Sequence, residues 1–288
     1  MMSMLIVIHY HHWSLFFLLS CLSIITVSVN GMTTQQPIQQ QDKIQQHRIF
    51  AYGDSLTAGT TLDKDNGNEL PLCPYAPILE LALHQQHRRR NNNCKDDAHD
   101  VLVRHRGLPG WTSQQMVDDL DGPNTGLRTA IVNAKNQTAA VVASSSALPT
   151  QQQQQPPPPP LSIVILLAGT NDIGYGLLDS EEIFENLWTL HQTCLDLGVP
   201  KTIAVGIPPS GYQAVNKVAR RTAQDVNRML EEQCRSTRTS TFVGFPFAYE
   251  PNGAHWSPDG LHFSQLGYKV LGEECLAPVV KQILDELL

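Results

Sequence analysis

The sequence predicts an α/β fold of three layers, with helices on both faces of a central, mostly parallel sheet of about five strands. Two observations support this prediction. Short apolar segments typical of buried strands alternate with segments whose apolar residues recur at helical spacing, and a turn with glycine or proline follows most expected strands. Such alternation requires right-handed crossovers and places a functional site at the carboxyl ends of the strands.

The expected strands are 48–52, 100–105, 161–168, 202–206 and 241–244. Segment 161–168 (LSIVILLA) is the most continuously apolar one after residue 29, as expected for a central strand buried on both faces. The expected helices are 70–83, 179–197, 215–230 and 265–274. A capping pair, Asp179 and Glu182, marks the start of the second helix, and Gly198 marks its end.

One domain accounts for most of the chain. With 288 residues, of which 41% are hydrophobic and 16% charged, the chain can bury one sizeable core. We expect this domain at 48–288, after a flexible, Gln-rich lead-in at 32–47. Residues 134–160 change from polar to Gln-rich and end in five consecutive prolines, so we expect an inserted surface loop there.

The net charge of the chain limits the classes of molecule that it is expected to bind. A formal net charge of −7 argues against a nucleic acid or an anionic membrane, because both require clustered Lys and Arg to neutralise phosphates. Three consecutive arginines at 88–90 form the only basic cluster, and we interpret them as part of a solvated polar loop.

The N-terminal segment predicts entry into the secretory pathway. Residues 1–29 contain no Asp, Glu, Lys or Arg, and 13–29 are almost wholly apolar. We expect a signal peptide at 1–31, cut near the small residues at 29–31, and hence secretion. The alternative is an uncleaved membrane anchor, because the usual positive charge is missing and the apolar stretch is long. In either case the Asn136-Gln137-Thr138 sequon predicts a glycan on Asn136.

Five cysteines follow the signal segment: Cys73, Cys94, Cys194, Cys234 and Cys275. In an oxidising compartment we expect one or two disulfides, whose pairing the sequence leaves open. Cys194 lies on the apolar stripe of the expected helix 179–197, which favours a buried thiol there. The chain has no Cys-x-x-Cys pair, so neither a zinc site nor a redox dithiol is expected.

Two motifs far apart in the chain can together provide a nucleophile and its base. Gly-Asp-Ser-Leu at 53–56 follows an expected strand, and Ser55 there can face a helix N-terminus whose free N–H groups favour a nearby oxyanion. Asp259 stands three residues before His262. One loop can therefore present a carboxylate to one imidazole nitrogen while the other nitrogen points at Ser55, which fixes the tautomer and stabilises the imidazolium.

Two further turns follow expected strands. Gly-Leu-Pro-Gly at 107–110 precedes a polar helix start, and Gly-Thr-Asn-Asp at 169–172 ends the central strand. The amide of Asn171 can donate to a developing oxyanion at such a strand end. The simpler interpretations are a tight turn for the glycines and a cap of the next turn for Asn171.

In this order, the four stretches resemble the sequence blocks of the GDSL, or SGNH, hydrolase family. The resemblance covers 48–288, with 134–160 as the main excess over the family pattern. It implies a flavodoxin-like sheet and ester hydrolysis through an acyl-enzyme, without a metal or an organic cofactor. The substrate would be a small-molecule ester, such as a lipid, an aryl ester or an acetylated sugar, and the protein a monomer.

The resemblance also implies a role for each matched residue. It makes Ser55 the nucleophile, His262 the base and acid, and Asp259 the residue that orients His262. It assigns the oxyanion hole to the backbone N–H groups of Ser55 and Gly110 and to the side chain of Asn171.

Two alternatives stay open. Asp54, Asp172, Asp259 and His262 could be ligands in a metal-dependent phosphoesterase, an arrangement that leaves Ser55 without a role. The same fold could serve a non-catalytic binding protein, although the nucleophile, acid and base positions are all filled. Aromatic residues that either line a substrate pocket or only pack are Trp111, Tyr75, Trp256 and Tyr212.

Overall fold

The structure is a computed structural model that describes residues 46–63, 67–90, 100–144 and 160–287. The chain divides into two units, Met1–Gln41 and Asp42–Leu288, and all described residues belong to the second. The predicted signal segment, nearly all of the predicted lead-in and Cys94 lie outside the described residues.

A five-stranded sheet, parallel throughout, forms the middle layer. Its strands are β1 (Gln46–Gly53), β2 (Asp100–Gly107), β3 (Leu161–Leu167), β4 (Lys201–Val205) and β5 (Ser240–Val243). They lie in the order β2-β1-β3-β4-β5, which is the flavodoxin-like order. The predicted α/β fold with a parallel sheet is confirmed.

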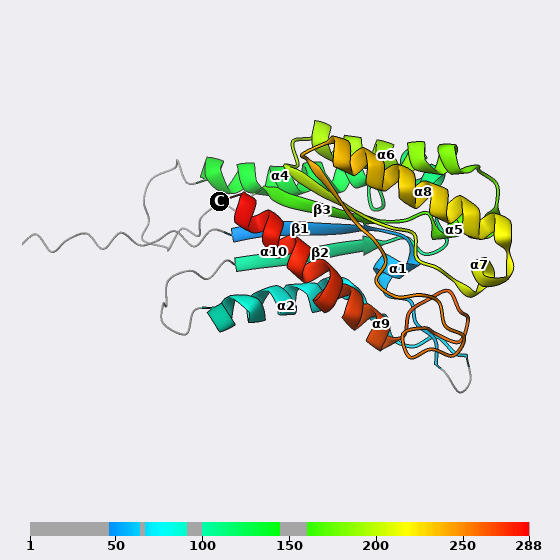
Figure 1. Cartoon of the computed structure of the whole chain (residues 1–288). Helices are drawn as coiled ribbons and strands as arrows, with labels where there is room; N and C mark the ends of the chain where they lie inside the picture. The colour runs from blue at the N-terminus through cyan, green and yellow to red at the C-terminus, as the bar shows by residue number, and fades with distance from the viewer. Residues whose placement is uncertain (1–45, 64–66, 91–99, 145–159, 288) are drawn as a thin grey trace, which may run out of the picture. The chain divides into compact units, whose positions relative to one another are not determined.

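Helices cover both faces of the sheet (Figure 1). One side carries α2 (Tyr75–Arg90), η1 (Val270–Leu276) and α10 (Ala277–Glu286), and the other carries α4 (Leu127–Ser144), α6 (Ser180–Asp196) and α8 (Lys217–Ser236). Short helices are α1 (Ser55–Ala58), α3 (Ser113–Asp118), α5 (Thr170–Tyr175), α7 (Gly211–Val215) and α9 (Gln265–Lys269).

Strand β1 shows why the sheet is buried on both faces. Ile49 and Ala51 belong to the apolar cluster beneath α2 and α10, whereas Phe50 and Tyr52 belong to the cluster beneath α4, α6 and α8. Successive side chains of a strand point to opposite faces, so a strand that packs on both sides must be apolar at nearly every position.

Three predicted helices have different limits in the structure. The helix expected at 70–83 begins only at Tyr75, directly after Pro74. The helix expected at 215–230 is two helices, because Asn216 accepts hydrogen bonds from Val218 N–H and Ala219 N–H and so starts α8 anew. The helix expected at 265–274 continues through η1 and α10 to Glu286.

The loop predicted at 134–160 is wrong at its beginning. Helix α4 runs to Ser144, and the backbone at 134–144 is therefore helical. Leu127, Ile131 and Ala134 are buried at helical spacing on the core side of α4, which explains why the helix extends past the expected boundary. Asn136 is exposed on this helix, and the Gln/Pro-rich stretch at 145–159 lies outside the described residues.

The arginine cluster and the cysteines also differ from expectation. Helix α2 runs to Arg90, so the backbone of 88–90 is helical rather than part of a loop. The described cysteines, Cys73, Cys194, Cys234 and Cys275, are free thiols, so the expected disulfides do not form among them. Cys194 is fully buried in the core, as predicted.

The strands that carry the site end side by side. Gly53 at the end of β1 pairs with Gly107 of β2 and with Leu167 of β3. A Cβ on Gly53 would lie 1.8 Å from the Leu167 carbonyl oxygen, and one on Gly107 would lie 2.1 Å from the Ala58 nitrogen. Both contacts are too close for any side chain, so glycine at these positions lets α1 begin directly at the sheet edge.

Candidate active site

Ser55 is the first residue of α1 and lies at the end of β1. The preceding residue, Asp54, is the N-cap of α1, and its Oδ1 accepts a hydrogen bond from Leu56 N–H at 3.0 Å. Ser55 is 6% exposed, so the residue is nearly buried. The Ser55 N–H group has no hydrogen-bond partner among the described residues.

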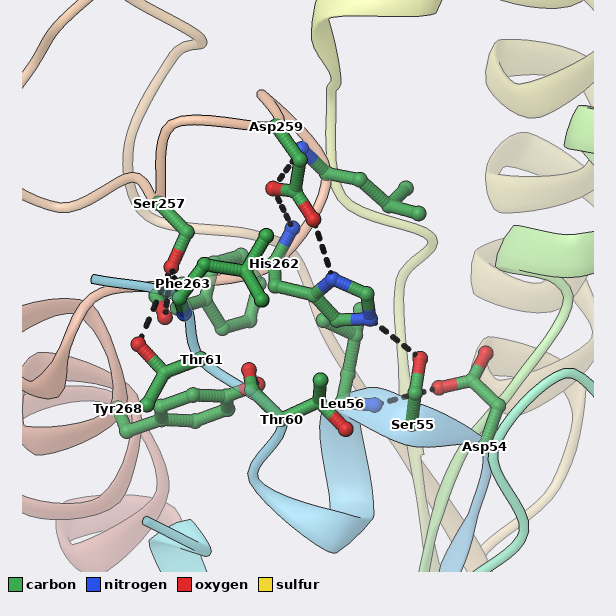
Figure 2. Close-up of polar contacts among 12 residues, drawn as sticks. Asp54, Ser55, Leu56, Thr60, Thr61, Ser257, Asp259, His262, Phe263 and Tyr268 are labelled. Carbon is green, nitrogen blue, oxygen red and sulfur yellow. Dashed lines mark hydrogen bonds and ion pairs between the residues drawn. The ribbon is translucent and has the colours of Figure 1, made fainter. Parts of the chain in front are cut away.

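His262 connects Ser55 to Asp259 (Figure 2). Its Nε2 lies 2.9 Å from Ser55 Oγ, and its Nδ1 lies 2.6 Å from Asp259 Oδ2. The other Asp259 oxygen, Oδ1, accepts hydrogen bonds from the N–H groups of Leu261 and His262, both at 3.0 Å. The carboxylate is therefore fixed by its own loop and cannot rotate away from the imidazole without losing these bonds.

The environment of Asp259 keeps it ionised. Burial by itself would raise the pKa of this carboxyl, but hydrogen bonds from the His262 ring and from the N–H groups of Leu261 and His262 hold the pKa below its ordinary value. A charged acceptor at Asp259 favours a proton on His262 Nδ1, which leaves Nε2 free to accept the Ser55 proton.

Residues distant in sequence anchor the loop that carries His262. Ser257 Oγ donates to the Phe263 carbonyl and lies 3.1 Å from Thr61 Oγ1, and Tyr268 Oη donates to the Thr60 carbonyl at 2.7 Å (Figure 2). The first contact lies within the loop, and the contacts with Thr61 and Thr60 attach the loop to the segment after α1. Sequence reasoning missed these two attachments, because each joins residues about two hundred positions apart and no local pattern signals them.

The turn after β2 contains Gly110 in the left-handed region, with φ of +80°. A non-glycine residue there would be strained. The Gly110 N–H group has no hydrogen-bond partner among the described residues. Thr112 then caps α3, accepting from Gln115 N–H while the Gln115 side chain accepts from Thr112 N–H.

The turn after β3 is bound to the turn after β2. Asn171 Nδ2 donates to the Trp111 carbonyl at 2.9 Å, which orients the amide and leaves its second N–H available. The Asp172 carboxylate accepts from Ser113 N–H at 2.9 Å and from Ser113 Oγ at 2.8 Å. Burial raises the pKa of Asp172, and the Ser113 bonds oppose that shift. The two turns therefore hold each other in place.

Asp54 is a fully buried carboxyl directly before Ser55. Burial raises its pKa from 3.8 to about 6, although the hydrogen bond from Leu56 N–H partly offsets the effect. Its Oδ2 has no hydrogen-bond partner among the described residues. This buried carboxyl therefore lies between the end of β1 and the start of α1.

The raised pKa of Asp54 predicts a loss of stability as pH rises. The folded protein binds this proton more tightly than the unfolded chain, so the stability from Asp54 is fully present below about pH 4 and is lost as pH rises through about 6. Urea denaturation measures the free energy of unfolding of wild type and of Asp54→Asn. Between about pH 4 and pH 8, the difference between the two should change by about 2 to 3 kcal/mol in favour of the variant. Asp118→Asn, at an exposed carboxylate, is the control. If the difference in free energy of unfolding between wild type and Asp54→Asn is the same at both pH values, the prediction is contradicted.

The four aromatic residues considered for a substrate pocket differ in burial. Tyr75 and Trp256 are buried in the core and serve packing. Tyr212 is 47% exposed on α7, and Trp111 packs against the α4, α6 and α8 side of the core. Of the four residues of the metal alternative, Asp259 and His262 contact each other at 2.6 Å, whereas the other two have separate partners. Asp172 bonds Ser113 and Asp54 caps α1; none of the described residues form a group of three or more acidic, His or Cys side chains able to hold a metal.

The chain matches the GDSL-like lipase/acylhydrolase family over residues 51–270. No curated protein sequence matches it.

Two solved structures resemble the chain. The native aryl esterase of M. smegmatis is 19% identical, with a TM-score of 0.53 over 82% of this chain and 99% of that one. Est24, a carbohydrate acetylesterase from Sinorhizobium meliloti, is 18% identical, with a TM-score of 0.54 over 82% of this chain and 99% of that one. Identities this low show a shared fold. The family match includes both the Ser55 turn and the His262 loop, and it shows that this chain belongs to the GDSL-like lipase/acylhydrolase family and is an ester-hydrolysing enzyme.

Proposed function

We propose that the protein is a serine esterase that cleaves carboxylic esters through an acyl-enzyme on Ser55. The observation that carries the proposal is the unbroken series of contacts from Ser55 Oγ to His262 Nε2 at 2.9 Å and from His262 Nδ1 to Asp259 Oδ2 at 2.6 Å. A nucleophile, a base and an orienting carboxylate in this order are what acyl transfer by serine requires.

In the first half of the reaction, Ser55 Oγ attacks the carbonyl carbon while His262 Nε2 takes the hydroxyl proton. Asp259 stays ionised and stabilises the imidazolium that forms. When the tetrahedral intermediate collapses, the bond to the alcohol oxygen breaks and His262 returns the proton to that oxygen. In the second half, a water molecule attacks the acyl carbon while His262 Nε2 takes a proton from it. The bond from the acyl carbon to Ser55 Oγ then breaks, His262 returns the proton to Ser55 Oγ, and the carboxylic acid leaves.

The oxyanion hole we propose consists of the N–H groups of Ser55 and Gly110 and of Asn171 Nδ2. The two backbone donors have no hydrogen-bond partner among the described residues, and Asn171 has one N–H left after its bond to Trp111. Donors that are fixed before the reaction stabilise the negative oxygen without reorganising. Asp172, through Ser113, supports this arrangement because it links the turns of Gly110 and Asn171.

Hydrolysis of p-nitrophenyl acetate tests the reaction class. We expect turnover that a chelator leaves unchanged and that Ser55→Ala removes while the melting temperature is retained. Loss of activity with a chelator would favour the metal-dependent phosphoesterase, and no turnover of any ester would favour a binding protein on the same fold.

We propose that the enzyme is a monomer and that its substrate is a small-molecule ester. The similar solved structures are an aryl esterase and a carbohydrate acetylesterase, so aryl esters and acetylated sugars are tested first, with lipid esters as the third class. A panel that varies acyl length and alcohol separately identifies the class by kcat/KM.

We further propose that the protein is secreted. The uncharged, largely apolar segment at 1–29 supports this proposal, and Asn136 is exposed on α4, where a glycan can be carried. The described residues include no helix with the length and hydropathy of a membrane span, and the N-terminal segment lies outside them. Expression in a eukaryotic secretory host should yield protein in the medium with an N-terminus near Met32 and a glycan on Asn136. Recovery only in membranes with an intact N-terminus would instead establish the anchor.

A further inference from the structure

A pocket of about 530 Å³ lies at the carboxyl ends of β4 and β5. It is next to the loop 257–262, called the catalytic loop below because it carries Asp259 and His262. It is formed by the turn after β4, by α7 and α8, and by the segment 245–249 after β5. Its volume is in the range of pockets that bind small molecules. Ser55, Asp259 and His262 do not line it, so it is distinct from the reacting centre.

The pocket and the catalytic loop share a wall. Gly211 N–H, at the start of α7, donates to the Gly260 carbonyl at 2.7 Å. Tyr249, which lines the pocket, packs so closely on Gly260 that a Cβ there would lie 2.8 Å from the Tyr249 hydroxyl oxygen. Gly260 stands between Asp259 and His262, so the Tyr249 side chain forms the wall between the pocket and that loop.

The framework of the pocket is held by satisfied hydrogen bonds. Asn227 accepts from Ile207 N–H at 2.7 Å and donates to the Ile207 carbonyl at 2.9 Å. Gln213 donates to the Pro208 carbonyl at 2.9 Å. Because these amides are occupied by backbone groups, the pocket is formed before any ligand binds.

One side of the pocket is aromatic and the other carries a positive charge. Phe245, Phe247 and Tyr249 supply the aromatic side. Arg220, on α8, also lines the pocket, and its guanidinium has no ion pair or hydrogen-bond partner among the described residues. By contrast, Arg228 further along α8 is paired with Asp225 and Glu232.

We propose that this pocket is a subsite for the alcohol part of the ester, and that Arg220 binds an anionic group, a carboxylate or a phosphate, carried by that alcohol. The proposal rests on the esterase function proposed above. His262 must protonate the departing alcohol oxygen, so the alcohol part lies on the side of the 257–262 loop, where the pocket is. The aromatic side accommodates its apolar body, and the planar guanidinium matches an anionic oxygen pair.

Paired substrates test the subsite. For 4-acetoxybenzoate against its neutral methyl ester, the ratio of kcat/KM values should fall about three- to tenfold in Arg220→Gln relative to wild type. In Arg220→Glu it should fall further, and added salt should lower the wild-type ratio. Arg221→Gln is the matched control, because Arg221 is the next residue on α8, is exposed and does not line the pocket. Acetylglycerol with and without a 3-phosphate repeats the comparison for phosphate.

Direct binding separates the subsite from the chemistry. Calorimetry of 4-acetoxybenzoate with Ser55→Ala should show binding that is weakened by Arg220→Gln and retained with Arg221→Gln. If wild type hydrolyses no ester but this Arg220-dependent binding is present, the pocket still binds an anion, whereas the proposed esterase function and with it the assignment to the alcohol part are overturned. If esters are hydrolysed but Arg220→Gln and Arg221→Gln behave alike for both carboxylate and phosphate, the subsite is overturned and the esterase stands.

Discussion

Alanine at position 262 should lower kcat for a soluble ester by about four to six orders of magnitude. Without the imidazole, Ser55 keeps its proton at the moment of attack, and nothing protonates the departing alcohol. The comparison requires purified protein whose melting temperature matches wild type. His84→Ala, a histidine on α2 that is only partly exposed, is the matched control and should retain full activity.

In the proposed mechanism Ser55 and His262 act as one unit, so the losses from removing each residue should not add. Ser55→Ala alone and Ser55→Ala with His262→Ala should have nearly the same residual rate, which comes from the oxyanion donors. Turnover within tenfold of wild type in folded His262→Ala would show that another group is the base.

Alanine at position 171 should lower kcat by about two to three orders of magnitude, equivalent to about 2.7–4 kcal/mol, with only a modest change in KM. In the proposed oxyanion hole, the hydrogen bond from Asn171 strengthens as negative charge develops on the oxygen, so its loss should appear in turnover rather than in substrate binding.

Asn171 also donates to the Trp111 carbonyl, so its removal could act by loosening the turn that carries Gly110. Asp172→Asn separates the two effects, because it weakens the link to Ser113 without removing the amide at 171. If Asp172→Asn lowers kcat as much as Asn171→Ala does, turn rigidity explains the loss. If Asn171→Ala retains wild-type kcat, Asn171 is only a structural residue of the turn.

The sheet could be predicted from the sequence because a strand buried on both faces leaves a continuous apolar pattern, as in β3. The C-terminal helix could not be followed past residue 274 because Pro278 has no N–H group for a helical bond. The helix nevertheless continues, because η1 is a π-helix in which Ala277 N–H donates to the Gly272 carbonyl. Pro278 then lies in the first turn of α10, where a residue without an N–H group is tolerated.

The pairing of Asp259 with His262 was also predictable, since three residues separate them and one loop can present both. The contact of His262 with Ser55 followed from the rule that parallel strands place their turns at one edge. The contacts of Asp172 with Ser113 and of Ser257 with Thr61 were not predictable, because they depend on where separate loops meet in the folded chain.

The most direct test of the account is the covalent modification of Ser55. A serine-directed fluorophosphonate should inactivate the enzyme with one adduct per chain, and peptide mapping by mass spectrometry should place that adduct on Ser55. His262→Ala should react far more slowly, because the same base activates Ser55 towards phosphorus. An adduct at another residue, or an active enzyme that resists the reagent and is instead inactivated by a chelator, would contradict the acyl-enzyme mechanism.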